Sequence, residues 1–346
     1  MPRNRTMLAL AVAAVLLPLG AVPAAAAAES GPRTGAAAQE GAAPAALPQN
    51  VETFMTAYRD WGTYPSTAKY MNLFTPTGTL MDSGLDAPKE RPGIEAQYNA
   101  LMCVTENSYR FAPGPPTSSP SGDVIFLKAR NTGHVKPAGT TTPIPFDFRT
   151  MHRLELNGSQ VQQGRRFWDQ TELFRSLDPT LPRLFEGMGP VAPAPAPATG
   201  PGVTPPTGGD PAQRLQAWNT RDADALVDGL TGPVRLSGPG LNGVLAGRAK
   251  AEEYLTRLFS GMTALQLAPG NRVQQGGTTF QEWVGHATVG ADRPPVTFGI
   301  VESFTRNQNG GTTWDLSFDT LDLVASPDRI NSLRVQLFGS PTQPAC

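Results

Sequence analysis

The sequence predicts an α+β fold in two similar halves, each a curved mixed or antiparallel sheet that wraps around helices. Three observations support this prediction. A stretch rich in proline, alanine and glycine at residues 189–211 divides the chain, and the same order of elements can be followed on either side of it. In both halves helical periodicity comes first and strand alternation comes later. This succession favours antiparallel hairpins over alternating βαβ units.

The amino-terminal residues have the pattern of a secretory signal peptide. Arg3 and Arg5 precede an apolar run at residues 7–19, and small residues follow up to Ala28. This order of a basic, an apolar and a small-residue region predicts cleavage near Ala28 and a protein secreted through the general, Sec-type route. The run is shorter than the roughly 20 apolar residues that a membrane-spanning helix needs, so no membrane attachment is predicted.

Composition divides the chain after the predicted signal peptide, residues 1–28, into five segments. They are a disordered Ala/Gly-rich segment at 29–47, a first domain at 48–188, a linker at 189–211, a second domain at 212–328 and a tail at 329–346. Alanine and glycine have too little apolar surface to form a core, so the first of these segments is expected to be disordered. Proline-rich linkers are semi-rigid spacers, and the two domains are therefore expected to fold separately.

The charge balance excludes two classes of partner. The chain has a formal net charge of −1 and no basic stripe in either domain. Nucleic acid and anionic membranes require such a stripe, so neither is expected as a partner. The two cysteines, Cys103 and Cys346, are compatible with a disulfide in an exported protein, but an even count alone leaves their pairing open.

In the first domain, apolar spacing predicts helices before strands. Val51, Phe54, Met55 and Tyr58 recur on one face of a helix expected at 51–61. The other elements expected in this domain are helices at 66–74 and 93–102 and strands at 79–82, 107–112, 123–134, 144–156 and 161–173.

The second domain repeats this order of elements, which predicts a tandem repeat. An apolar pocket between sheet and helices is expected in each copy. The elements expected in the second domain are helices at 212–220, 223–230 and 249–259 and strands at 234–237, 264–267, 279–289, 296–305 and 313–323.

The stretch FDFRTMHRLELNG, residues 146–158, contains an unexpected inward residue. Successive strand side chains point to opposite faces, and the alternation places Phe146, Phe148, His152 and Leu154 on the apolar face. The final Asn-Gly pair is typical of a hairpin turn. A histidine in an apolar row either has its nitrogens hydrogen-bonded within the core or serves acid–base chemistry near neutral pH.

Longer segments of both domains resemble a known family. The segments YRDWGTYPSTAKYMNLFTPTGTLMD and AWNTRDADALVDGLTGPVRLSG are similar to the opening of SnoaL-like domains of the nuclear transport factor 2 (NTF2-like) superfamily, and the closing hairpins fit the same family. The resemblance implies two tandem cone-shaped domains. Because related folds often dimerise through the sheet, it also implies that the two domains pack on each other as an intramolecular pseudo-dimer.

The resemblance leaves the activity open. The family includes polyketide cyclases, ketosteroid isomerases, limonene-epoxide hydrolases and many members without known activity, because one fold supports many chemistries. Arg166 stands where the epoxide hydrolases have an acid, and an arginine cannot act as a base. Epoxide hydrolysis by that route is therefore not expected.

By resemblance to ketosteroid isomerases, three residues of the first domain are catalytic candidates. The family's first-helix tyrosine corresponds to Tyr58, its base at the end of the first strand to Asp82, and its oxyanion acid to His152. Asp82 would move a proton between carbons, while Tyr58 and His152 would donate hydrogen bonds to a developing oxyanion. The alternative is that Tyr58 and His152 are core residues and that Asp82 caps the turn at Ser83-Gly84.

The second domain lacks the complete set. Ser237-Gly238 ends its first strand where the base would stand, and Trp218 lies near the tyrosine position. Glu302 is a lone inward carboxylate in the strand VTFGIVESF, at the place of the family's oxyanion acid. It would serve as a proton donor, or it would pair with a nearby arginine or reach solvent.

The predicted function is the binding of a small hydrophobic molecule in an apolar pocket of each domain. The alternative is a cofactor-free isomerase or polyketide-cyclase-like enzyme acting through the first domain, and the sequence leaves open whether the protein is an enzyme. Its three histidines show no metal-ligand spacing, so neither a metal nor a cofactor is expected. The side chains expected to bind the ligand are Phe54, Phe148, Trp168, Trp218, Phe298, Glu302 and Phe304.

Overall fold

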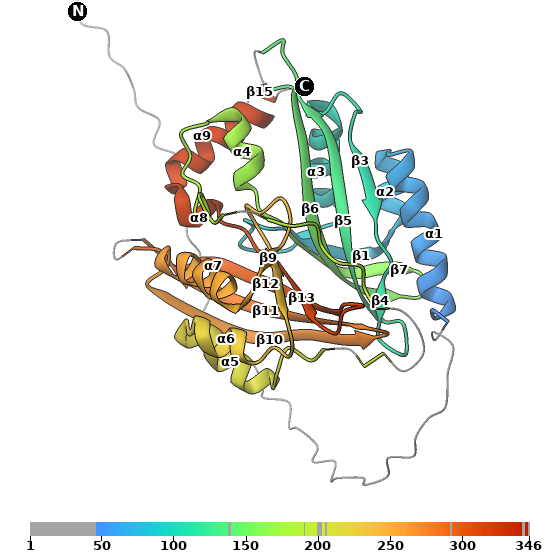
Figure 1. Ribbon diagram of the computed structural model, residues 1–346. Coiled ribbons are helices and arrows are strands. Elements are labelled where there is room, and N and C mark those ends of the chain that lie inside the picture. Colours follow the sequence, from blue (N-terminus) through green and yellow to red (C-terminus); the bar gives the residue numbers. More distant parts are fainter. Residues whose placement is uncertain are drawn as a thin grey trace, which may run out of the picture. The chain divides into compact units, whose positions relative to one another are not determined.

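The protein has a mixed α+β fold with two main sheets (Figure 1), which confirms the predicted fold class. The computed structural model describes residues 46–137, 140–189, 191–198, 203–204, 206–290, 293–340 and 343–344. All of them belong to one compact unit, Gly41–Cys346. The predicted signal peptide at 1–28 lies outside the described residues, as does all of the 29–47 segment except its last two residues.

The first half contains one mixed sheet and its helices. Its elements are α1 (Gln49–Thr63), α2 (Thr67–Asn72), β1 (Phe74–Met81), β2 (Lys89–Glu90), α3 (Arg91–Val104), β3 (Arg110–Pro113), β4 (Thr117–Ser118), β5 (Val124–Val135), β6 (Ile144–Asn157), β7 (Gln160–Phe167) and α4 (Thr171–Leu177). The strand order is β2-β1-β7-β6-β5-β3, with β4 beside β5.

The second half contains the other main sheet and ends in two helices. Its elements are α5 (Pro211–Thr220), α6 (Ala223–Asp228), β8 (Val234–Ser237), β9 (Leu245–Ala246), α7 (Arg248–Ser260), β10 (Ala264–Gln275), β11 (Thr278–Thr288), β12 (Val296–Arg306), β13 (Thr312–Ser317), α8 (Leu321–Val324) and α9 (Pro327–Phe338), with a two-stranded pair of β14 (Gly339–Ser340) and β15 (Gln343–Pro344). The strand order is β10-β11-β12-β13-β8-β9.

The two sheets share a pairing pattern. In each half the first long strand lies parallel to the last long strand, β1 beside β7 and β8 beside β13, while the neighbouring hairpins are antiparallel. In the first half α1 and α3 contact the sheet, and in the second half α5 and α7 do so. The order of helices and strands on the two sides of the linker therefore corresponds.

Helix α1 forms where the apolar spacing predicts it. Val51, Phe54, Met55 and Tyr58 are all buried along one face. These positions are three and four residues apart, so they lie one above the other on the helix surface. Trp61 extends the same face and is 2% exposed.

The last strand of each sheet is shorter than predicted. The expected strand at 161–173 ends at Phe167, because Asp169 accepts a hydrogen bond from the Thr171 amide at 3.1 Å and α4 begins there. In the same way, the expected strand at 313–323 stops at the end of β13. In both places an aspartate side chain binds the first amides of a short helix, which competes with strand pairing.

Strand β10 is longer than predicted. The expected strand covers only 264–267, whereas β10 runs past Pro269-Gly270 to Gln275. The strand continues beyond this pair with a shift of register between Pro269 and Arg272. Since β10 lies at the edge of its sheet, a proline that cannot donate a ladder hydrogen bond is tolerated there.

The carboxyl-terminal residues pack on the first half of the chain. Ile330, Leu333 and Leu337 of α9 belong to the same buried apolar cluster as α1 and α3. The Arg329 guanidinium binds the Asp178 carboxylate at 2.6 Å and so fixes the start of α9 beside the end of α4. The segment predicted as a tail at 329–346 is therefore largely a helix that completes the first core.

The two sheets contact each other through a small apolar cluster of their own. Phe126, Met151 and Phe167 of the first sheet pack against Val273, Phe280 and Val301 of the second. The Phe126 and Phe280 rings are stacked, with centroids 5.3 Å apart.

Parts of the predicted linker pair with the second half. Ala192 forms an isolated antiparallel bridge with Val244, and Pro197 forms one with Asn307. The domain boundaries and the separate folding of the two domains stay predictions.

In the described residues, no helix is long and apolar enough to cross a membrane. Cys103, on α3, is disulfide-bonded, whereas Cys346 lies outside the described residues.

Candidate functional site

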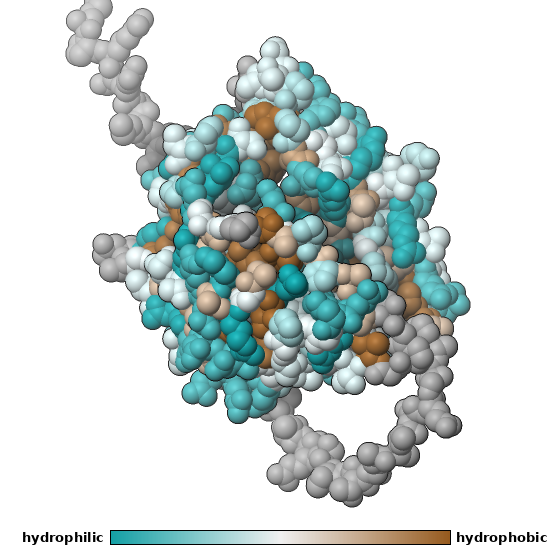
Figure 2. All heavy atoms as spheres, in the orientation of Figure 1, coloured by the Kyte–Doolittle hydropathy of each residue, from teal (hydrophilic) through white to brown (hydrophobic). Residues whose placement is uncertain are grey.

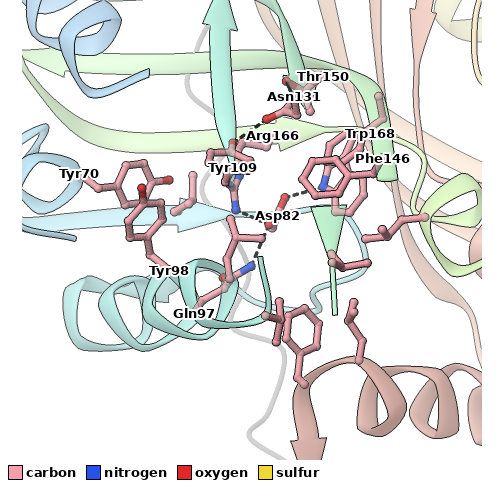
Figure 3. Close-up of a pocket in the computed structure, with 18 of the residues that line it drawn as sticks. Tyr70, Asp82, Gln97, Tyr98, Tyr109, Asn131, Phe146, Thr150, Arg166 and Trp168 are labelled. Atoms are coloured by element: carbon pink, nitrogen blue, oxygen red, sulfur yellow. Dashed lines mark hydrogen bonds and ion pairs between the residues drawn. The ribbon is translucent and has the colours of Figure 1, made fainter. Parts of the chain in front are cut away.

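The first half contains a cavity of about 100 Å³ between its sheet, α3 and the end of α9. The wall is largely apolar, and Figure 3 labels several of its aromatic side chains. Its aromatic side chains are Tyr70, Tyr98, Tyr109, Phe146, Phe148, Trp168 and Phe338. Apolar walls with a few polar groups are typical of small-molecule sites.

Asp82 is the polar centre of this cavity. It directly follows β1, and its carboxylate forms an ion pair with Arg166 of β7. Gln97 Nε2 and Trp168 Nε1 each donate a hydrogen bond to it at 2.9 Å, and the Ser83 amide donates another at 3.2 Å. Both carboxylate oxygens already have donors, so Asp82 acts as a charged anchor for three elements of the wall.

A chain of polar side chains leads from the cavity wall into the core. Tyr109 Oη donates to Asn131 Oδ1 at 2.6 Å, and Asn131 Nδ2 donates to Thr150 Oγ1 at 3.2 Å. Thr150 Oγ1 lies 2.9 Å from His152 Nε2, and His152 Nδ1 lies 2.7 Å from Tyr58 Oη. The first three residues of this chain line the cavity, and the last two lie behind them.

The inward histidine of β6 is a neutral, hydrogen-bonded group. Burial, and secondly the positive charge of Arg166, hold the pKa of His152 well below its usual value. A neutral imidazole offers one donor and one acceptor nitrogen, which match the hydroxyls of Thr150 and Tyr58. Burial also raises the pKa of Tyr58 well above its usual value, so its hydroxyl keeps its proton. Both ring nitrogens of His152 are therefore hydrogen-bonded within the core, which is one of the two arrangements expected for this histidine.

The three catalytic candidates are separated into two groups. Tyr58 and His152 bind each other inside the core, where Tyr58 also packs against Phe54 with ring centroids 5.0 Å apart. Asp82 lines the cavity and pairs with Arg166. A ligand in the cavity would therefore contact the wall residues of the polar chain before it reached His152.

Two of the predicted ligand-binding residues line the cavity. Phe148 and Trp168 stack on each other there, with ring centroids 4.6 Å apart. Phe54 instead belongs to the core behind the cavity.

In the second half, the corresponding interior is filled by an ion pair. Glu302 is fully buried and binds Arg214 through two hydrogen bonds of 2.6 and 2.7 Å. Trp283 Nε1 and Trp314 Nε1 also donate to its carboxylate, at 2.6 and 3.1 Å. This arrangement is the arginine-paired alternative for Glu302. The other predicted ligand-binding residues of this half, Trp218, Phe298 and Phe304, are buried in the same core.

Sequence reasoning missed the partners of Asp82. Gln97 lies on α3 and Arg166 on β7, and neither stands near Asp82 in the sequence. The wall also contains Leu337 and Phe338 of α9, from a segment predicted as a tail. One feature of the sequence indicated Arg166 as a partner. Arg166 stands where the epoxide hydrolases of the family have an acid, a position that predicts a charged side chain facing the interior.

A second hollow, of about 990 Å³, lies between the two sheets. It carries charged side chains that pair within its wall, Lys128 with Asp315 and Arg130 with Asp147. On the face shown in Figure 2, hydrophobic residues gather near the centre of the view, and hydrophilic residues surround them. Because the larger hollow lacks a dominant aromatic wall, the smaller cavity is the better candidate for a hydrophobic ligand.

In the described parts of the chain, no cluster of three or more histidine, cysteine, aspartate or glutamate residues could hold a metal ion.

Each half therefore has helices packed on a mixed sheet, and the cavity lies in the first half. Residues 212–314 match the family model described as a SnoaL-like domain. This match confirms the resemblance to SnoaL-like domains for the second half of the chain. No curated protein is significantly similar to the chain.

Several solved structures are similar to about a third of the chain. A hypothetical protein from Catenulispora acidiphila with a ketosteroid isomerase-like fold, in complex with trimethylamine, is 22% identical over 33% of this chain and 84% of its own, with a TM-score of 0.28. A proposed SnoaL-like polyketide cyclase from a Jannaschia species is 17% identical over 39% of this chain and 96% of its own, with a TM-score of 0.32. A phenazine biosynthesis-related protein from Pseudomonas aeruginosa is 10% identical over 41% of this chain and 96% of its own, with a TM-score of 0.35.

Proposed function

We propose that the first domain binds a small, largely hydrophobic molecule in its aromatic cavity. The observation that carries this proposal is the combination of an aromatic wall with one anchored polar centre at Asp82. Apolar surface drives binding, and a small number of fixed polar groups orients the ligand. The proposal is confined to the first domain, because the Arg214–Glu302 pair occupies the interior of the second.

The size of the cavity limits the ligand. An apolar cavity of about 150 Å³ is known to accept benzene, so the cavity of about 100 Å³ suits a single small ring or a short chain. A longer molecule would have to displace the end of α9, where Leu337 and Phe338 close one side.

Binding is favoured over acid–base catalysis by the state of the candidate groups. A general base needs an oxygen within reach of the proton that it removes. Asp82 instead accepts hydrogen bonds from several donors and pairs with Arg166, and His152 is enclosed by two hydroxyl partners. The isomerase-like alternative would require Asp82 to exchange these partners for a substrate.

The test is a toluene titration of the purified protein, followed by the chemical shifts of side-chain methyl groups. Leu101 lines the cavity and is partly exposed, so Leu101→Trp should fill the space without removing a polar contact. Leu215→Trp is the matched control, because Leu215 is a partly buried leucine beside the second core. We expect saturable binding in the wild type and in the control, and none in Leu101→Trp. Equal binding by all three proteins would disprove the site.

We also propose that the protein is exported. The support is the order of basic, apolar and small residues at 1–28. Amino-terminal sequencing of protein from the culture medium should give a start near residue 29. Recovery of the protein only inside cells, with Met1 still present, would contradict export.

A further inference from the structure

The wall of the first cavity has more unused hydrogen-bond donors than acceptors. Tyr70 lines the cavity, and its Oη forms no hydrogen bond with a described residue. Tyr98 Oη accepts a hydrogen bond from Trp61 Nε1 at 2.8 Å, but its own proton has no acceptor in the described part of the chain. Arg166 Nη2 donates a hydrogen bond to Asp82, and no described residue accepts a hydrogen bond from Arg166 Nη1 or Nε.

The acceptors of the same wall are mostly in use. The Asp82 carboxylate has donors on both oxygens, and Asn131 Oδ1 accepts from Tyr109. Among the described side chains of the wall, Gln97 Oε1 is an amide oxygen without a donor, and Gln97 is partly exposed to solvent. The cavity therefore has unused donors on Tyr70, Tyr98 and Arg166, and its unused acceptors include Gln97 Oε1 and the Tyr70 oxygen.

These donors stay protonated at neutral pH. Burial raises the pKa of Tyr70 and of Tyr98, so both hydroxyls keep their protons. The guanidinium of Arg166 cannot be deprotonated in a protein. A protonated phenol donates one hydrogen bond and its oxygen can also accept one, whereas a guanidinium can only donate and carries a positive charge.

The donors belong to one part of the cavity. The Tyr70 and Tyr98 rings are stacked with centroids 4.4 Å apart, and Figure 3 shows both beside the Asp82–Arg166 pair. The charge of Arg166 acts on the Tyr70 hydroxyl. Lys89 lies close enough for its ammonium to interact with both Asp82 and Arg166. Arg166 and Lys89 are therefore both cations near the Asp82 carboxylate, and of the two only Arg166 lines the cavity.

We propose that this cavity selects a small monocarboxylate, with an apolar ring or chain against the aliphatic wall and the carboxylate against Tyr70, Tyr98 and Arg166. A carboxylate has only acceptor sites and takes charge-assisted hydrogen bonds from such donors. The inference rests on the proposed function, since it assigns a chemical class to the ligand of the same cavity.

Benzoate is a suitable probe, with toluene and nitrobenzene as comparisons. Toluene has the apolar ring alone, and nitrobenzene has two acceptor oxygens of similar shape without a charge. We expect benzoate to bind at least tenfold more tightly than toluene at neutral pH, and nitrobenzene to lie between them. Isothermal titration or competition with toluene measures the three affinities.

Tyr70→Phe is the decisive variant. It removes one hydroxyl and no hydrogen bond between described residues, because Tyr70 Oη has no partner in the described chain. An Arg166 variant is unsuitable alone, since it would leave the buried Asp82 carboxylate unpaired. Tyr64→Phe is the matched control, because Tyr64 is 69% exposed. We expect Tyr70→Phe to weaken benzoate about tenfold and to leave toluene unchanged, and the control to change neither.

The outcomes separate the two proposals. If toluene binds and benzoate binds no more tightly, the carboxylate inference is wrong and the apolar site stands. If Tyr70→Phe weakens benzoate and toluene equally, the tyrosine acts through packing and the inference is again overturned. If neither probe binds the wild type, the proposed function itself fails, and the carboxylate inference fails with it.

Discussion

His152 is buried on the inward face of its strand, and both of its ring nitrogens have partners within the core. Its ring nitrogens bind the hydroxyls of Thr150 and Tyr58, and it is 3% exposed. Sequence alternation correctly places His152 on the inward face of its strand. It cannot show what lies opposite, because Tyr58 comes from α1, more than ninety residues earlier. The choice between core and site therefore depends on tertiary contacts.

We predict that His152→Phe lowers stability and leaves ligand affinity unchanged. Two buried hydroxyls would lose a partner, and each unsatisfied buried group costs about 1–3 kcal/mol. His286→Gln is the control, because His286 is exposed on β11. Urea unfolding and toluene titration measure the two effects. A loss of toluene affinity without a loss of stability would show that His152 contributes to ligand binding.

The same histidine predicts a pH effect. Its folded-state pKa lies well below the usual value, so the unfolded chain binds this proton more readily. The stability that comes from the neutral ring is present above pH 6.5, approximately the pKa of an unperturbed histidine, and is lost as the pH falls below it. The unfolding free energy of His152→Phe should therefore depend less on pH between 7 and 5 than that of the wild type.

At the scale of elements, the strongly periodic segments were predictable and their ends were not. The alternation at 144–156 corresponds to β6 almost residue for residue. The boundary between β7 and α4 was not predictable, because the Asp169 side chain that stops the strand also binds Thr320 of the second half. Helix α9 was not predicted, because its apolar residues are buried only by contact with the core of the first half.

Helix α9 should control the size of the cavity. Leu337 is 1% exposed and lines the cavity from the end of the helix. We predict that Leu337→Ala lowers stability by about 2–5 kcal/mol, as is usual for a buried leucine, and allows a larger molecule such as naphthalene to bind. Val335→Ala is the control, since Val335 is 46% exposed on the same helix. Unchanged naphthalene binding in Leu337→Ala would show that α9 does not limit the site.

At the scale of the molecule, the two halves contact each other through matching loops. Asp169, after β7, accepts from the Thr320 amide at 3.0 Å, and Asp319, after β13, accepts from the Gln170 amide at 3.0 Å. The hydroxyls of Thr171 and Thr320 lie 2.7 Å apart at the centre. This reciprocal exchange supports the proposal of an intramolecular pseudo-dimer. We expect a monomer by light scattering, and a stable dimer of whole chains would argue against the proposal.

The two aspartates of this contact oppose each other electrostatically. Burial raises the pKa of Asp169 and of Asp319, and the charge of Asp169 raises that of Asp319 further. Ionisation therefore destabilises the folded state, and stability is lost as the pH rises above about 3.9, the ordinary aspartate value. Asp169→Asn keeps an oxygen for its three described donors and removes one charge. We predict a higher melting temperature at pH 7 and no gain below pH 4.

Asp178 is a control for Asp169, because its pKa is shifted in the opposite direction. Hydrogen bonds from Thr180, and then from Arg329, lower the pKa of Asp178 to about 2. Its ionised form stabilises the fold at neutral pH, and this contribution is lost as the pH falls toward 2. Asp178→Asn should therefore lower the melting temperature at pH 7. A drop for Asp169→Asn as well would show that the Asp169 charge supports the contact between the halves.

The central claim is that the first cavity holds a small molecule, and it is tested most directly by mass spectrometry of the protein purified from its native source under non-denaturing conditions. Leu101→Trp fills the cavity wall, whereas Leu215→Trp changes a comparable position beside the second core. We predict one bound small molecule per chain in the wild type and in Leu215→Trp, and none in Leu101→Trp. A molecule retained at full occupancy by Leu101→Trp would contradict the account.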